Sequence, residues 1–149
     1  MVFLVLNVCL HYLANGVYNT INLMNKASYH ILRVGLAITF IWIGILILKS
    51  PESWGGYLRP WAVELLPVSI SRALIGTAIL DIAIGILFLI DWLPWFAGLI
   101  ASLHLIIVLI SSGITDITVR DIGLLAATIV IAIESLPFNI KRKLNKINS

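Results

Sequence analysis

The sequence has little charge and almost no cysteine. Charged residues make up 11% of its 149 residues, whereas hydrophobic residues make up 60%. A soluble domain averages about 25% charged and roughly 45–50% apolar residues, so these charges are too few to cover a water-exposed surface. The single cysteine, Cys9, has no second thiol to pair with, so an intramolecular disulfide is excluded and a cysteine-ligated metal is not expected. The composition therefore predicts an integral membrane protein whose main partner is the lipid bilayer.

Motifs of the common catalytic and cofactor sites are also missing. The chain has no glycine-rich phosphate loop, no HExxH and no GxSxG sequence. Of the three histidines, His11 and His30 fall outside or at the edge of the apolar segments, so two histidines that could clamp a haem are lacking. We therefore expect no covalently bound cofactor and no metal site. We also expect no nucleic-acid partner, because a basic cluster beside an apolar helix usually faces anionic lipid.

What the sequence does contain is four long apolar segments, at residues 29–48, 73–90, 95–112 and 119–136. Each is close to the 20 or so helical residues that cross a hydrocarbon core about 30 Å thick. Helix is the expected structure, because an isolated strand in lipid would leave its backbone groups unpaired. The short links at residues 91–95 and 112–116 make the helices that they join antiparallel neighbours. The prediction is an all-α fold, an integral membrane four-helix bundle.

Three segments flank or interrupt these helices. The connection at residues 50–71 is rich in proline and aromatic residues, and we expect a short amphipathic helix at residues 61–66 to lie in the membrane interface. Residues 1–28 contain a short, interrupted apolar run, which predicts an interfacial helix or an extension ahead of a start at Met24, with a fifth spanning helix as the alternative. The expected organisation is thus an N-terminal segment (1–28), a four-helix domain (29–136) and a basic tail (137–149).

The basic residues of the tail indicate how the chain is oriented. Four of them lie close together, namely Lys141, Arg142, Lys143 and Lys146. Such clusters favour the cytoplasmic face of the membrane. An even number of spans then places both the N-terminus and the C-terminus in the cytoplasm, in a multi-pass protein of the cell membrane. A homo-oligomer is compatible with this pattern.

Two ionisable residues fall near the middle of the membrane. Asp81 lies midway along the second apolar segment and His104 midway along the third. A charge at that depth costs about 2.5–3.5 kcal/mol unless it is paired, neutralised or hydrated. Ala73, Thr77, Asp81 and Gly85 follow one another at intervals of four, and small residues on one face let membrane helices approach closely. We expect Asp81 to face the interior, and Asp81 and His104 are the candidates for binding a ligand or carrying a proton. The alternative is that Asp81 only locks the bundle through a hydrogen bond.

Other charges are expected near the two membrane faces. Arg33 and Glu134 lie at similar depth near the cytoplasmic side, and an ion pair between them is predicted, with Asp91 as the rival partner of Arg33. A structural clamp is favoured there over any chemistry. The faces that would bring the two helices together contain Arg33, Ala37 and Gly44 on the first and Gly123, Ala127 and Glu134 on the fourth. The opposite face would have a rim of charges, solvated or forming an anion-binding mouth, made of Lys49, Arg72, Arg120, Asp116 and Asp121.

Several stretches resemble the DoxX family of small four-helix membrane proteins. They are Leu-Arg-Val-Gly-Leu at residues 32–36, Leu-Asp-Ile-Ala-Ile-Gly-Ile-Leu at residues 80–87 and Arg-Asp-Ile-Gly-Leu-Leu at residues 120–125. The resemblance covers about residues 29–136. It departs at Asp81, where the family usually has a glutamate. It implies a membrane subunit that docks a soluble or membrane redox partner, or that handles a quinone-sized apolar ligand, because some relatives belong to membrane oxidoreductase complexes.

Three functions therefore remain open. The favoured hypothesis is an accessory or docking subunit, in keeping with the resemblance, of a membrane oxidoreductase complex. The second is a quinone- or small-molecule-binding oxidoreductase subunit that uses Asp81 and His104. The third is a small transporter or proton pathway. A cavity that reaches the carboxyl group or the imidazole would favour a ligand, whereas a filled bundle would favour the accessory subunit.

Overall fold

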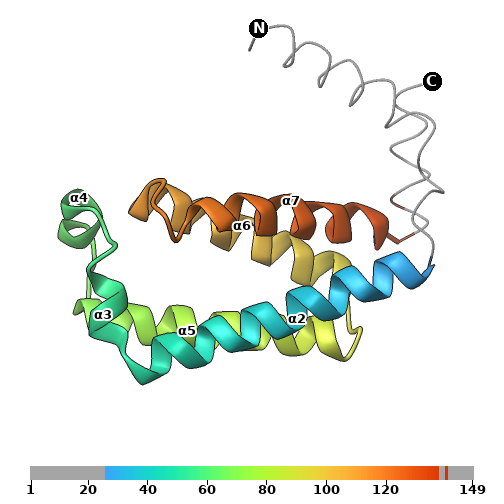
Figure 1. The fold of residues 1–149 in the computed structure, drawn as a ribbon, viewed down its shortest axis with the longest axis horizontal. Coiled ribbons are helices and arrows are strands. Elements are labelled where there is room, and N and C mark those ends of the chain that lie inside the picture. The colour runs from blue at the N-terminus through green and yellow to red at the C-terminus, as the bar shows by residue number, and fades with distance from the viewer. Residues whose placement is uncertain (1–25, 138–139, 141–149) are drawn as a thin grey trace, which may run out of the picture.

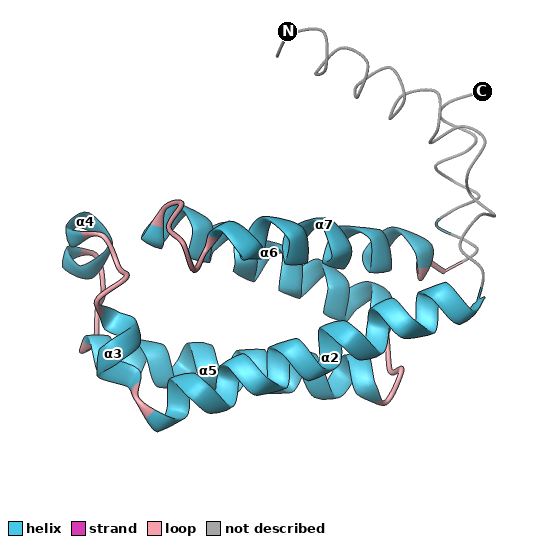
Figure 2. Cartoon of the chain, in the orientation of Figure 1, coloured by secondary structure: helices cyan, strands magenta, loops and turns pink. Residues whose placement is uncertain are grey.

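Every regular element in the described part of the chain is an α-helix (Figure 2). The computed structural model describes residues 26–137 and residue 140, and no strand occurs among them. Most of the predicted N-terminal segment (1–28) and nearly all of the basic tail (137–149) lie outside the described residues. The fold class predicted from the sequence, all-α, is confirmed for the described part.

Four long helices follow the four predicted segments. They are α2 (Lys26–Lys49), α5 (Ile70–Leu89), α6 (Pro94–Ser112) and α7 (Val119–Glu134). The first begins at Lys26, so the last residues assigned to the N-terminal segment belong to this helix. Between α5 and α6 the chain turns sharply, because Asp91 and Leu93 both adopt positive φ angles, 58° and 47°. Pro94 then opens α6, since its fixed φ suits the first helical position.

The four helices differ in their capacity to cross a membrane. By length and composition, α2, α5 and α6 are long and apolar enough to do so, and within the described residues these three meet that standard. The fourth, α7, has 16 residues, which is about 24 Å of helix at a rise of about 1.5 Å per residue. It ends at Glu134, shortly before Pro137, and proline disfavours helical geometry in the residue before it.

Two short helices occupy the long connection. These are α3 (Pro51–Gly55) and α4 (Pro60–Glu64), and each starts on a proline. The predicted amphipathic helix at residues 61–66 overlaps α4. The sequence did not predict α3, because five residues are too few to show a helical period.

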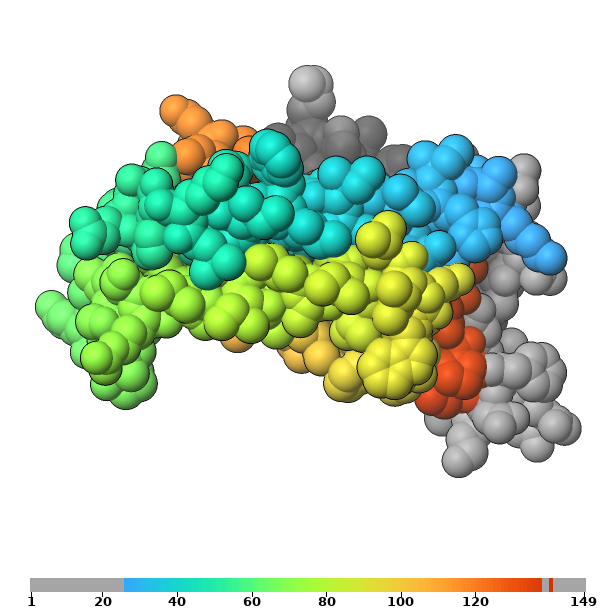
Figure 3. All heavy atoms as spheres, turned by 90° about the horizontal axis from the view of Figure 1, so that it is seen from below, coloured from blue at the N-terminus to red at the C-terminus, as the bar shows by residue number. Residues whose placement is uncertain are grey.

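The long helices form two antiparallel pairs, α2 with α5 and α6 with α7 (Figure 1). Figure 3 shows α2, in blue to teal, lying along α5, in green to yellow. The start of α2 and the end of α7 lie at one end of the bundle, where the Tyr29 hydroxyl is 2.7 Å from the Ser135 hydroxyl. The opposite end contains α3, α4 and the turn between α6 and α7 (Figure 1). Consecutive long helices therefore run in alternating directions.

Small residues permit the close approach within each pair. A Cβ atom added to Gly85 of α5 would lie 2.9 Å from the Ala37 carbonyl oxygen of α2, and one added to Gly98 of α6 would lie 2.9 Å from the Thr128 carbonyl oxygen of α7. The predicted packing face of α7 is corrected in part. Gly123 is exposed with open space around it, and the buried residues of α7 are Asp121, Thr128 and Ile131.

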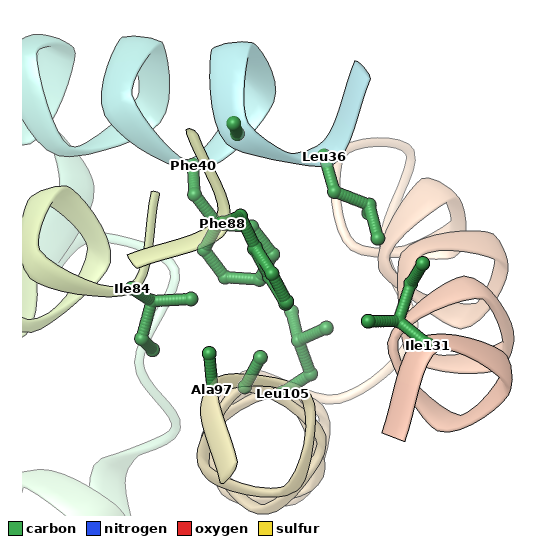
Figure 4. Packing of buried hydrophobic residues seen from close by; sticks show 9 residues of the cluster. Leu36, Phe40, Ile84, Phe88, Ala97, Leu105 and Ile131 are labelled. Atoms are coloured by element: carbon green, nitrogen blue, oxygen red, sulfur yellow. The ribbon is translucent and has the colours of Figure 1, made fainter. Parts of the chain in front are cut away.

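The apolar core lies between the two pairs. Side chains from all four long helices point toward one another there (Figure 4). Phe40 of α2 and Phe88 of α5 pack with their rings tilted and their centroids 6.1 Å apart, and Ile131 of α7 is fully buried beside Ala97 and Leu105 of α6. This core fixes the depth at which the polar residues of α5 and α6 meet.

A candidate ligand cavity with an aspartate–histidine pair

A cavity of about 260 Å³ lies between the helices. Residues of all six described helices line it, and most of the lining is apolar. Trp54 of α3 and Ala62 of α4 contribute to it, so the cavity extends toward the end of the bundle that contains the two short helices. Its inner part reaches Phe40, Asp81 and His104.

Asp81 and His104 contact each other beside this cavity. The Nε2 atom of His104 is 3.1 Å from Oδ1 of Asp81, and the side chains are only 10% and 6% exposed. This distance fits a hydrogen bond from the imidazole N–H to the carboxyl oxygen. The structure therefore brings together the two residues that the sequence singled out, and their role as ligand or proton carriers stays a prediction.

The local sequence explains why Asp81 points inward. Ala78, Asp81, Gly85 and Phe88 follow one another at helical intervals and are all buried, whereas Ile79, Leu80 and Ile86 are exposed. On α6, His104 lies next to buried Leu105 and one turn after Ala101. Both helices thus turn a face of small and polar residues toward the bundle interior.

Asp121 also lines the cavity, and the sequence placed it elsewhere. It was expected in the charged rim, but only 8% of the residue is exposed. The Nε atom of Arg120 is 4.0 Å from its carboxylate, and the Arg120 side chain is 55% exposed. Asp121 interacts electrostatically with both Asp81 and His104. The signal that could have found it is the helical spacing of Asp121, Leu124, Thr128 and Ile131, but the adjacent arginine suggested a surface position.

The remaining rim residues are exposed. This holds for Lys49, Arg72, Asp116 and Arg120, and none of them lines the cavity. They match a solvated rim more closely than a gathered anion site.

Arg33 lies at the other end of the bundle and holds helix ends together. Its Nε atom is 3.4 Å from Oδ1 of Asp91, the rival partner that the sequence offered. Its guanidinium group also donates to the carbonyl oxygens of Phe88 and, at 3.2 Å, of Leu89. Glu134, the first predicted partner, lies at the end of α7 beside the Ser135 that contacts Tyr29. The arrangement is that of a structural clamp.

The wall of the cavity near α3 and α4 is fastened to the end of α6. The backbone N–H of Arg59 donates to the Ser111 carbonyl at 2.9 Å. The Arg59 guanidinium occupies the space where a side chain on Gly113 would lie, and Gly113 has a φ of 75°, which glycine adopts without strain. Trp54 and Tyr57, both cavity residues, pack edge to face with centroids 6.3 Å apart.

Neither a cluster of metal ligands nor a similar known protein identifies the site. Among the described residues, no cluster of three or more His, Cys, Asp or Glu side chains could hold a metal ion. Comparisons of the chain with protein-family models, with curated proteins and with solved structures find no match. The geometry of the cavity is therefore the basis for assigning a function.

Proposed function

We propose that this chain is a membrane protein with four spanning helices that binds a small, largely apolar molecule in the cavity against Asp81 and His104. The observation that carries the proposal is the contact between a mostly apolar cavity and a buried polar pair. Ligand sites are typically concave, mostly apolar and supplied with a few polar groups that orient the ligand.

The outer surface supports a membrane environment. Trp42, Ile79 and Ile110 are each about 60% exposed, on α2, α5 and α6 respectively. Leaving such side chains in water would cost about 25 cal/mol for every Å² of apolar area, whereas lipid removes that cost. The fourth helix, α7, is shorter but packs along α6. A short spanning helix is accommodated by thinning of the bilayer or by flanking side chains that reach the interface.

The cavity favours a ligand-binding subunit over an accessory subunit. A purely docking bundle needs no internal space, and its polar pair could be packed as tightly as the core around Phe40 and Phe88. The volume of about 260 Å³ is close to the lower end of ligand sites, about 300–1,000 Å³. It suits the ring of a quinone with its tail in lipid, the ligand class that the DoxX resemblance suggests. The ligand would replace one partner in the Asp81–His104 contact, because the imidazole N–H can donate to a ring oxygen and Asp81 can accept from a hydroxyl group of the reduced ring.

The experiment measures binding of a short-chain alkyl benzoquinone to the protein in lipid nanodiscs. His104→Leu removes the imidazole, and we expect it to weaken binding by about tenfold or more, because a buried hydrogen bond to the head group is lost. Ser102→Ala is the matched control. Ser102 is buried two residues earlier on α6 but bonds to Thr128 and does not line the cavity.

The control variant should bind as the wild type does. Absence of binding to the wild-type protein would overturn the proposal. So would equal binding by a folded His104→Leu variant, since the ligand would then rest elsewhere.

A further inference from the structure

We infer that the cavity selects ligands with a positively charged, hydrogen-bond-donating head, such as a protonated amine, and rejects anionic ones. This inference rests on the proposed ligand site and adds a preference among head groups, in which a cationic donor binds more tightly than a neutral ring of the quinone class. Its basis is the set of charged groups around the cavity. Two carboxyl groups and one imidazole line it, from Asp81, Asp121 and His104, and in the described part of the chain no lysine or arginine does.

The charge balance of the cavity follows from how these groups pair. Asp81 and His104 pair with each other at 3.1 Å. Asp121 adds a second carboxyl group, which that pair leaves unmatched. The cavity lining therefore contains more acidic than basic groups.

Asp121 is the group that a ligand could still satisfy. The Asp121 side chain is 11% exposed, and its ionic partner within the described residues, Arg120, is 4.0 Å away. Hydrogen bonds join nitrogen and oxygen atoms at about 2.7–3.2 Å, so this pair is too long to be one. A buried carboxyl group without a donor is destabilising, and a ligand that supplies a donor removes that penalty.

The surrounding residues favour a cation over a neutral donor. Asp121, Asp81 and His104 come from three different helices, α7, α5 and α6, and interact electrostatically across the cavity. A cationic head near Asp121 gains charge-assisted hydrogen bonds, which are stronger than neutral ones. The aromatic rings of Trp54 and Tyr57 also line the cavity, and aromatic rings attract cations.

The arginine side chains at this end of the bundle do not cancel the preference for a cationic ligand. The Arg59 guanidinium lies over Gly113, and the Arg120 side chain is mostly exposed. Neither lines the cavity. Exposed charges are screened by water and salt, so their effect on a head group inside the cavity is weaker than that of Asp121.

A set of probes of matched size tests the selection directly. These are 2-phenylethylamine, 2-phenylethanol and 3-phenylpropanoate, whose heads are positive, neutral and negative at neutral pH. Nanodiscs of zwitterionic lipid avoid a bilayer charge that would concentrate one probe. We expect the amine to bind about tenfold or more tightly than the alcohol, and the carboxylate to bind most weakly.

Two substitutions that each remove one carboxyl group distinguish the effect of a cavity residue from that of a rim residue. Asp121→Asn should reduce the affinity for the amine to that for the alcohol. Asp116→Asn, at an exposed residue of the turn that leads into α7 and does not line the cavity, should leave the amine preference unchanged. The ranking of the three probes on the wild-type protein needs no variant, so the test holds even if Asp121→Asn does not fold.

The outcomes distinguish this inference from the proposed function. Equal binding of amine and alcohol, or tighter binding of the carboxylate, overturns the charge selection but leaves the ligand site standing. A folded Asp121→Asn variant with an undiminished amine preference also overturns it. If none of the probes binds, the charge selection is overturned, whereas the proposed ligand site is decided by the benzoquinone measurement on the wild-type protein.

Discussion

At the scale of single residues, two ion pairs in the described part of the chain, Arg33 with Asp91 and Asp81 with His104, are arranged differently. Arg33 caps a helix end, because its guanidinium donates to the Phe88 and Leu89 carbonyls that the end of α5 leaves without helical partners. The Asp91 carboxylate compensates its charge from the following turn. Asp81 and His104 instead satisfy each other beside an open space. Of these two pairs, the second lines the cavity and can offer polar atoms to a ligand.

Two substitutions of Asp81 distinguish the contribution of its size to stability from the contribution of its hydrogen bond. Asp81→Asn keeps the shape and a partner for the His104 ring, so we expect thermal stability in nanodiscs close to that of the wild type. Asp81→Leu leaves the imidazole buried without its partner and should lower the free energy of unfolding by about 1–3 kcal/mol. A thermal melt followed by size-exclusion chromatography measures both. If Asp81→Leu melts with the wild type, the contact contributes nothing to the fold.

At the scale of elements, each antiparallel pair is held by contact between backbones. Gly44 and Gly85 bring α2 against α5, since a Cβ atom at either position would meet carbonyl oxygen atoms of the neighbouring helix, those of Ala78 and Ala37. Between α6 and α7, the buried Ser102 and Thr128 hydroxyls join at 2.9 Å. Such contacts suit lipid, where association of helices depends on close packing and interhelical hydrogen bonds.

A β-branched side chain at position 85 should push α2 and α5 apart and lower the stability of the protein. Gly85→Val places atoms against Ile41 and the Ala37 carbonyl of α2. Overpacking of this kind typically costs about 1–3 kcal/mol. Gly76→Val is the control, because a Cβ atom added to Gly76, on the same helix, would meet no neighbouring atom within 4 Å. The melting temperature should fall for Gly85→Val and hold for Gly76→Val, and equal melting of the two would mean that the close approach is unimportant.

The elements also show what could be predicted from the sequence. The apolar segments and the prolines between them predict the four long helices, with ends that shift by a few residues. Asp81 and His104 were predictable because charge is rare at that depth and demands a partner. Asp121 was not, because Arg120 beside it suggested a solvated rim. The cavity was not predictable either, since its size depends on how far the two helix pairs diverge, and helical periodicity does not contain that distance.

At the scale of the whole molecule, the polar features separate along the bundle axis. One end combines the Arg33 clamp with the contact between Tyr29 and Ser135. The other combines α3, α4 and the cavity residues Tyr57 and Asp121. If the basic tail lies in the cytoplasm, the cavity extends toward the external face, and ligand would reach Asp121 before Asp81.

The last prediction decides whether α7 crosses the membrane. We expect reporter fusions after Gly56 and after Ser149 to lie on opposite sides, with Ser149 in the cytoplasm, because α2, α5, α6 and α7 alternate in direction. A fusion after Trp92, in the turn between α5 and α6, should report the same side as Ser149. If only α2, α5 and α6 crossed the membrane, the fusions after Ser149 and Gly56 would report the same side, and the fusion after Trp92 would report the other side. The number of crossings within residues 1–25 does not alter this comparison, because they precede all three fusion points. Paired reporters that are active on only one side of the membrane measure it, and Gly56 and Ser149 on the same side would remove α7 from the spanning helices.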